Sequence, residues 1–388
     1  MISVAEADRL LAELAPPAQT EEVPLDQAVD RILAAHVAAD RDGPPYDRVA
    51  MDGYAVAAAE RDPWTVASSQ FAGRPPLTRP DGATAIEVAT GSVLPLGCDA
   101  VVPYEQTVRS AETVTLLAGM NVLPRQHVHG KGADYRQGQP LLASGTRLRS
   151  PHLHALASVG VDRVPVLRRL RWSLGSTGDE LVEVDSTPEP WQIRRSNAQA
   201  IAGEAGAWGL SPSRQRVLPD DPLRLRAGVE ELLAGADVLV LTGGVSAGKL
   251  DLVPSVLADL GYRTVFHKIS QKPGKPLWCG VSKGVHPTVV FGLPGNPVSS
   301  LFAFRRYVLP WLLGAEGRRP PDQRIEAWGL KPPPAGQTVF LPWSTTEGPL
   351  AAQGSGDFLS LTRSTGFIEV SDPSSLTHPL YYPWGGLP

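Results

Sequence analysis

The chain has 388 residues, of which 42% are hydrophobic and 20% are charged, and its formal net charge is −4. This length exceeds one ordinary hydrophobic core and predicts roughly two to four domains. The slightly acidic balance argues against a protein that binds nucleic acid or a membrane surface. No apolar run approaches the roughly 18 residues of a membrane-spanning helix, so we expect a soluble protein.

The two cysteines, Cys98 and Cys279, are far apart and have no metal-binding spacing. Such sparse usage favours a reduced, cytoplasmic location, although the sequence alone leaves open one long-range disulfide. The chain begins with a predicted helix rather than a signal peptide.

The first 40 residues contain two predicted helices. A capping box at Ser3 and Glu6 begins the first, which ends before Pro16, and helical apolar spacing predicts the second over roughly residues 25–35. A similar mixture of helical and β-prone segments returns near Ser150, where a further helix is predicted to begin. We therefore join residues 1–40 and 137–167 into one discontinuous domain.

Residues 41–136 have a different sequence pattern, with short, turn-rich, β-prone segments and no predicted helix of more than three turns. This predicts an inserted, mostly β domain. Asp52-Gly53 lies in its most distinctive string. On chemistry alone Asp52-Gly53, Thr90-Gly91 and the segment before Asp134 indicate only turns.

From about residue 168 predicted strands and helices alternate, as in a parallel sheet with crossover helices. The clearest unit is the strand Val238–Leu241, followed by a glycine turn and a helix that begins at Asp251. Backbone amides in such a turn form an anion site together with a helix N-terminus; an ordinary tight connection is the alternative. We expect this domain to span residues 168–314 and a small β domain to span residues 315–388.

The same glycine turn resembles a P-loop but lacks one essential residue. Gly243 to Lys249 fits G-x-x-x-x-G-K, yet Leu250 follows where a P-loop has the Ser or Thr hydroxyl that holds magnesium. We therefore exclude a P-loop.

Glycine-rich turns also follow two more predicted strands, those that contain Leu174 and Phe291. The carboxyl ends of parallel strands meet at one edge of an open sheet, where ligands bind. Only seven of the 36 basic residues are lysines, yet Lys268, Lys272 and Lys275 fall together between two of these strands. Lysine suits phosphates and oxyanions, whereas a solvated basic loop is the alternative.

Three acidic residues, Glu180, Asp220 and Asp251, follow strands or begin helices along the same edge. Carboxylates beside phosphate-binding amides suit a magnesium ion that is shared with substrate phosphates. Helix capping is the alternative for each of them. The sequence contains no Ser-His-Asp, zinc or haem arrangement.

Seven strings along the chain carry a family resemblance: PPYDRVAMDGYAV, ATGSVLPLGCDAVVPYEQT, GADYRQG, STGDEL, LTGGVSAG with Asp251, KISQKPGKP and GLPGNPVSS. With these strings in this order, the chain resembles the MoeA family of bacterial molybdopterin molybdenumtransferases from about residue 3 to residue 310.

The resemblance implies an α/β multidomain fold. Its αβα core domain would be similar to molybdopterin adenylyltransferases and would be joined by a discontinuous dimerisation domain, an inserted β-rich domain and a C-terminal β domain. It implies insertion of molybdate into adenylylated molybdopterin, with release of AMP and a requirement for magnesium. It also implies a homodimer with its active cleft between residues 168–314 of one subunit and residues 41–136 of the other. Other proteins of molybdenum-cofactor biosynthesis would be further partners.

Motif match assigns the site residues. Asp52, Thr90 and Asp134 would face the substrate across the dimer interface. Glu180, Asp220 and Asp251 would hold the metal. The expected catalytic residues are Asp52, Asp134, Glu180, Asp220, Asp251 and Lys268, and Thr90 would bind the substrate. The remaining substrate-binding positions would be Gly243, Gly244, Ser246, Lys272, Lys275, Pro294, Gly295, Asn296, Pro297 and Ser355. We expect molybdate to contact one of the three lysines rather than an arginine.

The chain departs from the family pattern at three positions. Arg195 and Lys249 stand where acidic residues are common, and Tyr135 stands where a small aliphatic residue is frequent. Two alternative functions remain open: adenylyl transfer from ATP to molybdopterin, which would not need the inserted domain, and a binding scaffold similar to the eukaryotic relative gephyrin.

Overall fold

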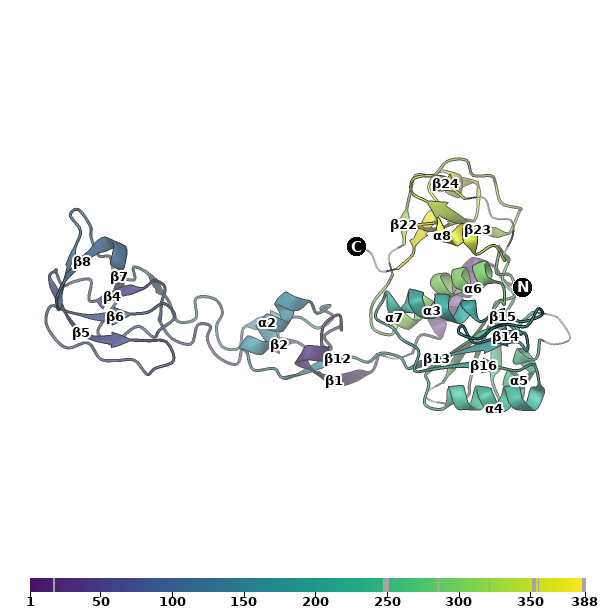
Figure 1. Cartoon of the computed structure of the whole chain (residues 1–388), viewed down its shortest axis with the longest axis horizontal. Coiled ribbons are helices and arrows are strands. Elements are labelled where there is room, and N and C mark those ends of the chain that lie inside the picture. The colour runs from purple at the N-terminus through teal and green to yellow at the C-terminus, as the bar shows by residue number, and fades with distance from the viewer. Residues whose placement is uncertain are drawn as a thin grey trace. The chain divides into compact units, whose positions relative to one another are not determined.

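The computed structural model describes residues 1–16, 18–246, 251–284, 287–320, 322–350, 354 and 356–385. The chain divides into two compact units (Figure 1). We call Met1–Glu21 with Leu167–Pro388 the sheet unit, and Glu22–Val166 the β-rich unit. Among the described residues, no helix combines the length and apolar character that a membrane span requires.

A six-stranded sheet with the order β16-β13-β17-β21-β20-β18 forms the centre of the sheet unit. Its strands are β13 (Trp172–Thr177), β16 (Arg214–Leu218), β17 (Val238–Thr242), β18 (Arg263–His267), β20 (Trp278–Val281) and β21 (Val289–Leu293). The first four in spatial order are parallel, whereas β20 is antiparallel to both of its neighbours. The predicted sheet is thus confirmed, but its expected uniform direction is wrong at β20. The connections on either side of β20 are too short for the crossover that a parallel strand needs.

Helices cover both faces of this sheet. They are α1 (Val4–Glu13), α3 (Ser196–Gly206), α4 (Pro222–Leu233), α5 (Val253–Asp259), α6 (Pro297–Ala303), a π-helical turn η3 (Phe304–Val308) and α7 (Leu309–Gly314). Val238 and Val240 pack into one core cluster, while Leu239 and Leu241 pack into another on the opposite face. Because both faces are buried, β17 has the continuous apolar sequence that is typical of a central parallel strand.

Helix α1 packs with the sheet unit rather than with the segment to which the sequence prediction assigned it. Val4, Ala7 and Leu11 belong to the same core cluster as Trp172, and Trp311 Nε1 donates to the carbonyl oxygen of Leu11 at 3.1 Å. The assignment of residues 1–40 to one domain is therefore wrong for the first 21 residues. An apolar helix face shows that a partner exists but does not identify it.

The β-rich unit contains a second six-stranded sheet, with the order β7-β4-β6-β5-β9-β8. The elements between residues 20 and 167 are β1 (Thr20–Pro24), η1 (Leu25–Gln27), β2 (Val37–Ala38), β3 (Arg48–Val49), β4 (Gly53–Val56), β5 (Trp64–Gln70), β6 (Thr84–Val88), β7 (Ala100–Pro103), η2 (Tyr104–Gln106), β8 (Thr107–Ser110), β9 (Thr113–Leu116), β10 (Val128–His129), β11 (Pro140–Leu142), α2 (Ser150–Ser158) and β12 (Arg163–Leu167). The expectation of a mostly β insertion is confirmed.

The predicted helix over residues 25–35 is wrong. Only the short η1 forms, and Ile32 and Leu33 instead make β-bridges with Arg147 and Val166. Asp30 has a left-handed backbone with φ of 65°, which ends any helix there, and its Oδ1 accepts from Arg147 Nε at 2.6 Å. Long-range pairing thus overrides the local helical spacing.

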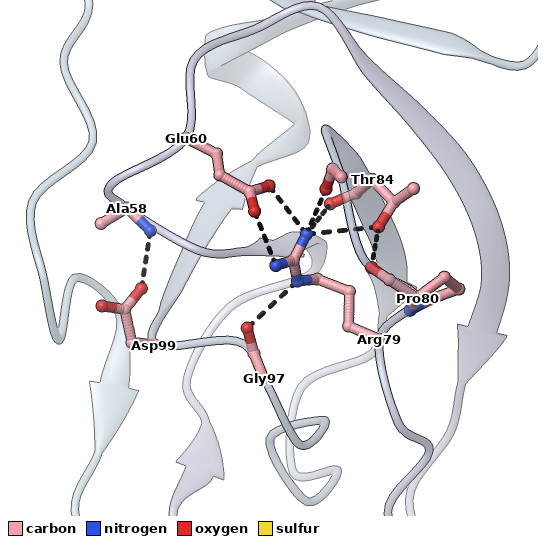
Figure 2. Close-up of polar contacts among 8 residues, drawn as sticks. Ala58, Glu60, Arg79, Pro80, Thr84, Gly97 and Asp99 are labelled. Carbon is pink, nitrogen blue, oxygen red and sulfur yellow. Dashed lines mark hydrogen bonds and ion pairs between the residues drawn. The ribbon is translucent and has the colours of Figure 1, made fainter.

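Arg79 orders the loops at one end of the β-rich sheet (Figure 2). Its Nη1 and Nη2 donate to the two carboxylate oxygens of Glu60 at 2.8 and 2.9 Å, and its Nε donates to the carbonyl oxygen of Gly97 at 3.0 Å. Burial raises the pKa of the neighbouring Cys98 thiol to about 12, so this free cysteine stays protonated at neutral pH. The turn-rich segments are therefore fixed by side-chain bonds as well as by strands.

The C-terminal segment forms a third sheet, with the order β19-β23-β25-β26-β22, in which β24 also pairs with β23. Its elements are β19 (Gln271–Lys272), β22 (Gln323–Arg324), β23 (Thr338–Ser344), β24 (Gly348–Pro349), α8 (Leu359–Thr362), β25 (Gly366–Val370), η4 (Pro373–Leu376) and β26 (Leu380–Pro383). The small C-terminal β domain is thus confirmed. Strand β19 lies in the loop that contains Lys268, Lys272 and Lys275, which we call the lysine-rich loop. The pairing of β19 with β23 therefore attaches this loop to the C-terminal sheet.

Candidate functional site

A pocket of about 810 Å³ lies at the carboxyl ends of the parallel strands β13, β17 and β21. Its walls come from the turns that follow these strands, from β14 (Leu181–Val182) and β15 (Ile193–Arg194), and from the first residues of α3 and α6. This is the edge that the sequence predicted. The volume falls in the range of roughly 300–1,000 Å³ that is typical of small-molecule sites.

Ten of the residues predicted from the sequence line this pocket: Glu180, Asp220, Gly243, Gly244, Ser246, Asp251, Pro294, Gly295, Asn296 and Pro297. Lys268, Lys272 and Lys275 are not among its lining residues. Asp52, Thr90 and Asp134 belong to the β-rich unit. Ser355 and Lys249 lie outside the described residues.

The turn after β17 needs glycine at two positions. Gly243 and Gly244 have φ angles of 90° and 65°, in the left-handed region that other residues rarely adopt. A Cβ atom on Gly243 would lie 2.7 Å from Thr177 Oγ1, and the Gly243 amide donates to the carbonyl oxygen of Leu293 at 3.0 Å. The turn is therefore held between the ends of β13 and β21, with its backbone at the pocket wall.

The turn after β21 is linked directly to the start of α3. Asn197 Nδ2 donates to the carbonyl oxygen of Gly295 at 2.6 Å, and both residues line the pocket. The positive end of the α3 dipole also lies at this wall, because Ser196 and Asn197 are its first residues. This side of the pocket is thus suited to anions.

Carboxylates gather on the other turns of the pocket. Burial, followed by the nearby charges of Asp179, Glu180 and Asp251, raises the pKa of Asp220 above its usual value. Glu180 folds back so closely that a Cβ on Gly178 would overlap its carboxylate. Such crowding of negative charge is what a bound cation would relieve.

The acidic residues do not form a complete protein cage for a metal. Among the described residues, no group of three or more His, Cys, Asp or Glu side chains is close enough to hold an ion. Magnesium commonly keeps several waters and takes one or two carboxylates together with substrate phosphates. The residues present therefore fit a magnesium ion that binds with a phosphorylated substrate.

The lysine-rich loop lies beside the pocket and contributes only Pro276 to its lining. The amide of Lys268 donates to the carbonyl oxygen of Leu277 at 2.9 Å, and its φ is 72°. Buried Gln271 orders the loop by accepting from the Tyr307 hydroxyl at 2.5 Å and donating to the Gly274 carbonyl oxygen at 3.1 Å.

Two cationic residues that the sequence analysis did not assign to the site do line the pocket. They are Arg194 and Arg195, at the end of β15 and the start of α3. The string IRRSN, which lies between a short β-prone segment and a helix, was the feature of the sequence that could have indicated these two cations. In the sequence, Arg195 stands out only as a departure from the family pattern.

In the β-rich unit, two of the three predicted substrate-facing residues are in contact. Asp52 Oδ1 accepts from the Thr90 amide at 2.6 Å, and this bond holds the pKa of Asp52 below its usual range. Asp134 Oδ1 lies 2.8 Å from His129 Nε2. The two contacts lie near neighbouring strands. Strand β3, which precedes Asp52, pairs with β10, which contains His129, and Arg48 is opposite His129 in this pairing. The role of this surface in substrate binding stays a prediction.

Comparisons with known proteins agree with this architecture. Residues 2–160 match a family model described as the MoeA N-terminal region (domain I and II), and residues 174–314 match a probable molybdopterin binding domain. The molybdopterin molybdenumtransferase of Synechocystis sp. is 34% identical over 382 residues, with 95% of each chain covered. That of Synechococcus elongatus is 34% identical over 377 residues, with 93% of each chain covered.

A solved structure gives the same result for the fold. The crystal structure of a molybdopterin biosynthesis MoeA protein from Pyrococcus horikosii has a TM-score of 0.78 and 30% identity, with 100% of both chains covered. The chain therefore belongs to the MoeA family of molybdopterin molybdenumtransferases.

Proposed function

We propose that the chain inserts molybdate into adenylylated molybdopterin and releases AMP, and that the pocket of the sheet unit is where this happens. The relatives that match nearly the whole chain are named molybdopterin molybdenumtransferases, and the chain is a transferase of molybdenum-cofactor biosynthesis. The single observation that carries the finer proposal is the pocket of about 810 Å³, which combines a glycine turn, three carboxylates and two arginines.

The chemistry requires two anions to meet. Molybdate is a dianion and the nucleotide substrate carries several negative charges, so their approach must be offset by positive charge. The Gly243 amide is bonded to Leu293 and fixes the turn, so that the backbone amide of Gly244 would hold a phosphate. The lysine-rich loop beside the pocket would supply cations for the oxyanion. The chain's residues would thereby bind and orient both substrates before the phosphoanhydride bond is broken.

A magnesium ion would be held by one or two of the carboxylates of Glu180, Asp220 and Asp251 together with substrate phosphates. When bound, it would stabilise the negative charge that develops at the phosphorus. The raised pKa of Asp220 beside two other acidic side chains supports this assignment.

The cleft would be completed by a second copy of the chain in a homodimer. The pocket is lined by residues of the sheet unit, while Asp52, Thr90 and Asp134 lie in the β-rich unit. Their carboxylates and hydroxyl would orient the substrate from the other side.

Molybdate-dependent release of AMP from adenylylated molybdopterin tests the proposal. We expect AMP to appear only when molybdate and magnesium are both present, as measured by chromatography. Formation of adenylylated molybdopterin from ATP in the absence of molybdate would instead identify an adenylyltransferase. A stable protein with neither activity would favour the binding scaffold.

The three lysines of the loop give a narrower prediction. Replacing Lys268, Lys272 or Lys275 by alanine in turn should raise the molybdate concentration for half-maximal AMP release by about tenfold in at least one variant, since a charge-assisted contact is lost. Lys283→Ala is the matched control, because Lys283 follows β20 at the opposite edge of the sheet. Unchanged half-saturation in all three variants would contradict the role of the lysines.

A further inference from the structure

Arg195 is a partly buried cation in the wall of the pocket. It lies between β15 and α3, and its amide donates to the carbonyl oxygen of Val182 at 3.0 Å. Its side chain is only 15% exposed. The position of this charge is thus fixed by the pairing of β14 with β15 and by the start of α3.

Glu183 holds one edge of the Arg195 guanidinium. Arg195 Nε donates to Glu183 Oε2 at 2.6 Å, while the neighbouring Arg194 uses its Nε to bind the carbonyl oxygen of Ser186 at 3.1 Å. A guanidinium has five N–H donors, so the pair with Glu183 leaves the four on Nη1 and Nη2 for other partners. A fork of donors that is held at one edge is well suited to the oxygens of a phosphate.

We propose that Arg195 binds the phosphate of the nucleotide part of the substrate. The inference rests on the proposed function, because it takes the pocket to be the nucleotide site. Two features of the same wall favour a phosphate over a neutral group. The first residues of α3 present the positive end of its dipole, and Asn197 and Gly295 are bonded across this part of the wall. The carboxylates of Glu180, Asp220 and Asp251 lie on other turns of the pocket, where a cation can bind the same phosphates.

The competing explanation is structural. Arg195 and Arg194 both bind the segment between β14 and β15, through Glu183 and Ser186, so Arg195 could serve only to hold that segment. In that case loss of Glu183 would have the same effect as loss of Arg195, and neither would distinguish a ligand with a phosphate from one without.

Binding of AMP and adenosine to the full-length protein, measured by calorimetry, separates these explanations. Arg195→Ala should weaken AMP binding by about tenfold to a hundredfold while changing adenosine binding by less than about twofold, since only AMP has the phosphate. Arg195→Lys should fall between the wild type and Arg195→Ala, because lysine keeps the charge but lacks the fork.

Two control variants complete the experiment. Glu183→Ala removes the partner of Arg195 but keeps the cation, and it should cost less than about threefold in AMP affinity. Arg226→Ala, which breaks an exposed pair with Glu230 on α4, should change nothing. Equal losses of AMP affinity in Glu183→Ala and Arg195→Ala, or unaltered AMP binding in Arg195→Ala, would overturn the role of Arg195 but not the proposed function. Failure of the wild type to bind AMP at all would overturn the proposed nucleotide pocket and the inference together.

Discussion

Gly243 shows how strongly a single position in the pocket is constrained. Its φ of 90° and the distance of 2.7 Å from a built Cβ to Thr177 Oγ1 both oppose a side chain. An alanine there costs roughly 1–2 kcal/mol in backbone strain and also displaces the turn. We predict that Gly243→Ala lowers AMP release at least about tenfold, because it would displace the turn that we propose to hold the phosphate.

Gly203 on α3 provides the matched control. It is helical, and a Cβ there would meet nothing within 4 Å. Gly203→Ala should keep activity and raise the thermal midpoint slightly, because alanine favours a helix by about 1 kcal/mol over glycine. Full activity of Gly243→Ala would show that the turn tolerates displacement and does not bind the substrate closely.

Asp47 stabilises the surface of the β-rich unit that carries Asp134. Its carboxylate accepts from Arg125 Nη1 and Nη2 at 2.5 and 2.9 Å and from the Lys131 amide at 2.8 Å. The Arg125 guanidinium holds the pKa of Asp47 below its usual range. A lowered folded-state pKa adds stability that is present above the unfolded-state pKa of about 3.9 and is lost as the pH falls through the folded-state value.

We therefore predict that Asp47→Asn lowers the thermal midpoint at pH 7. This difference should shrink as the pH falls below the unfolded-state pKa and through the lower folded-state pKa, because the wild-type carboxylate then also becomes protonated. Thermal unfolding of both proteins across this pH range measures the effect. A difference that stays constant with pH would mean that the ionised carboxylate does not supply the stability.

At the scale of elements, the glycine turn after β17 could be predicted because its signal is local. The apolar run Val238–Leu241 and the glycines that follow determine strand and turn without reference to the rest of the chain. The helix expected at residues 25–35 failed because Ile32 and Leu33 pair with residues more than a hundred positions away. The direction of β20 likewise depends on its neighbours in the sheet.

The pocket wall at Arg195 was missed for a related reason. A short strand such as β15 has almost no periodicity, so the sequence does not show which way its charged residues face. The acids and glycines were easier to place because each follows a recognisable strand end.

Arg305 connects α3, the π-helical turn and the C-terminal sheet. Its side chain is fully buried, and its Nε lies 3.3 Å from Glu204 Oε1 and donates to the carbonyl oxygen of Pro383 at 3.0 Å. The guanidinium also lies 5.6 Å from the ring centre of Trp208 and 5.8 Å from that of Tyr382. Within the sheet unit, the C-terminal sheet is therefore attached to α3 and the π-helical turn partly through one cation.

We predict that Arg305→Met destabilises the protein by about 3–5 kcal/mol, because it leaves the buried Glu204 carboxylate without its cation. Burial already raises the pKa of Glu204. Thermal unfolding measures the loss, and the double variant Arg305→Met with Glu204→Gln should recover part of it. If the double variant is no more stable than Arg305→Met alone, an unpaired carboxylate is not the cause.

At the scale of the whole molecule, the local chemistry of the sequence predicts one part of the candidate site, whereas the other part can be inferred only from related proteins. Strand ends, glycines and carboxylates place the pocket of the sheet unit. Nothing in the local chemistry of Asp52 or Asp134 connects them to it, because each looks like an ordinary turn residue and lies in the other unit. Their proposed role therefore rests on the family resemblance and on the proposed homodimer.

Mixing two inactive variants tests this homodimeric cleft most directly. Asp134→Asn alters the β-rich unit and Asp251→Asn alters the sheet unit, so each should be nearly inactive alone in AMP release. After unfolding and refolding together in equal amounts, about half of the dimers would contain one copy of each variant, and each of these would have one intact cleft built from the two unaltered units. We predict recovery of about a quarter of the wild-type activity, whereas a mixture no more active than its separate components would contradict a cleft shared between subunits.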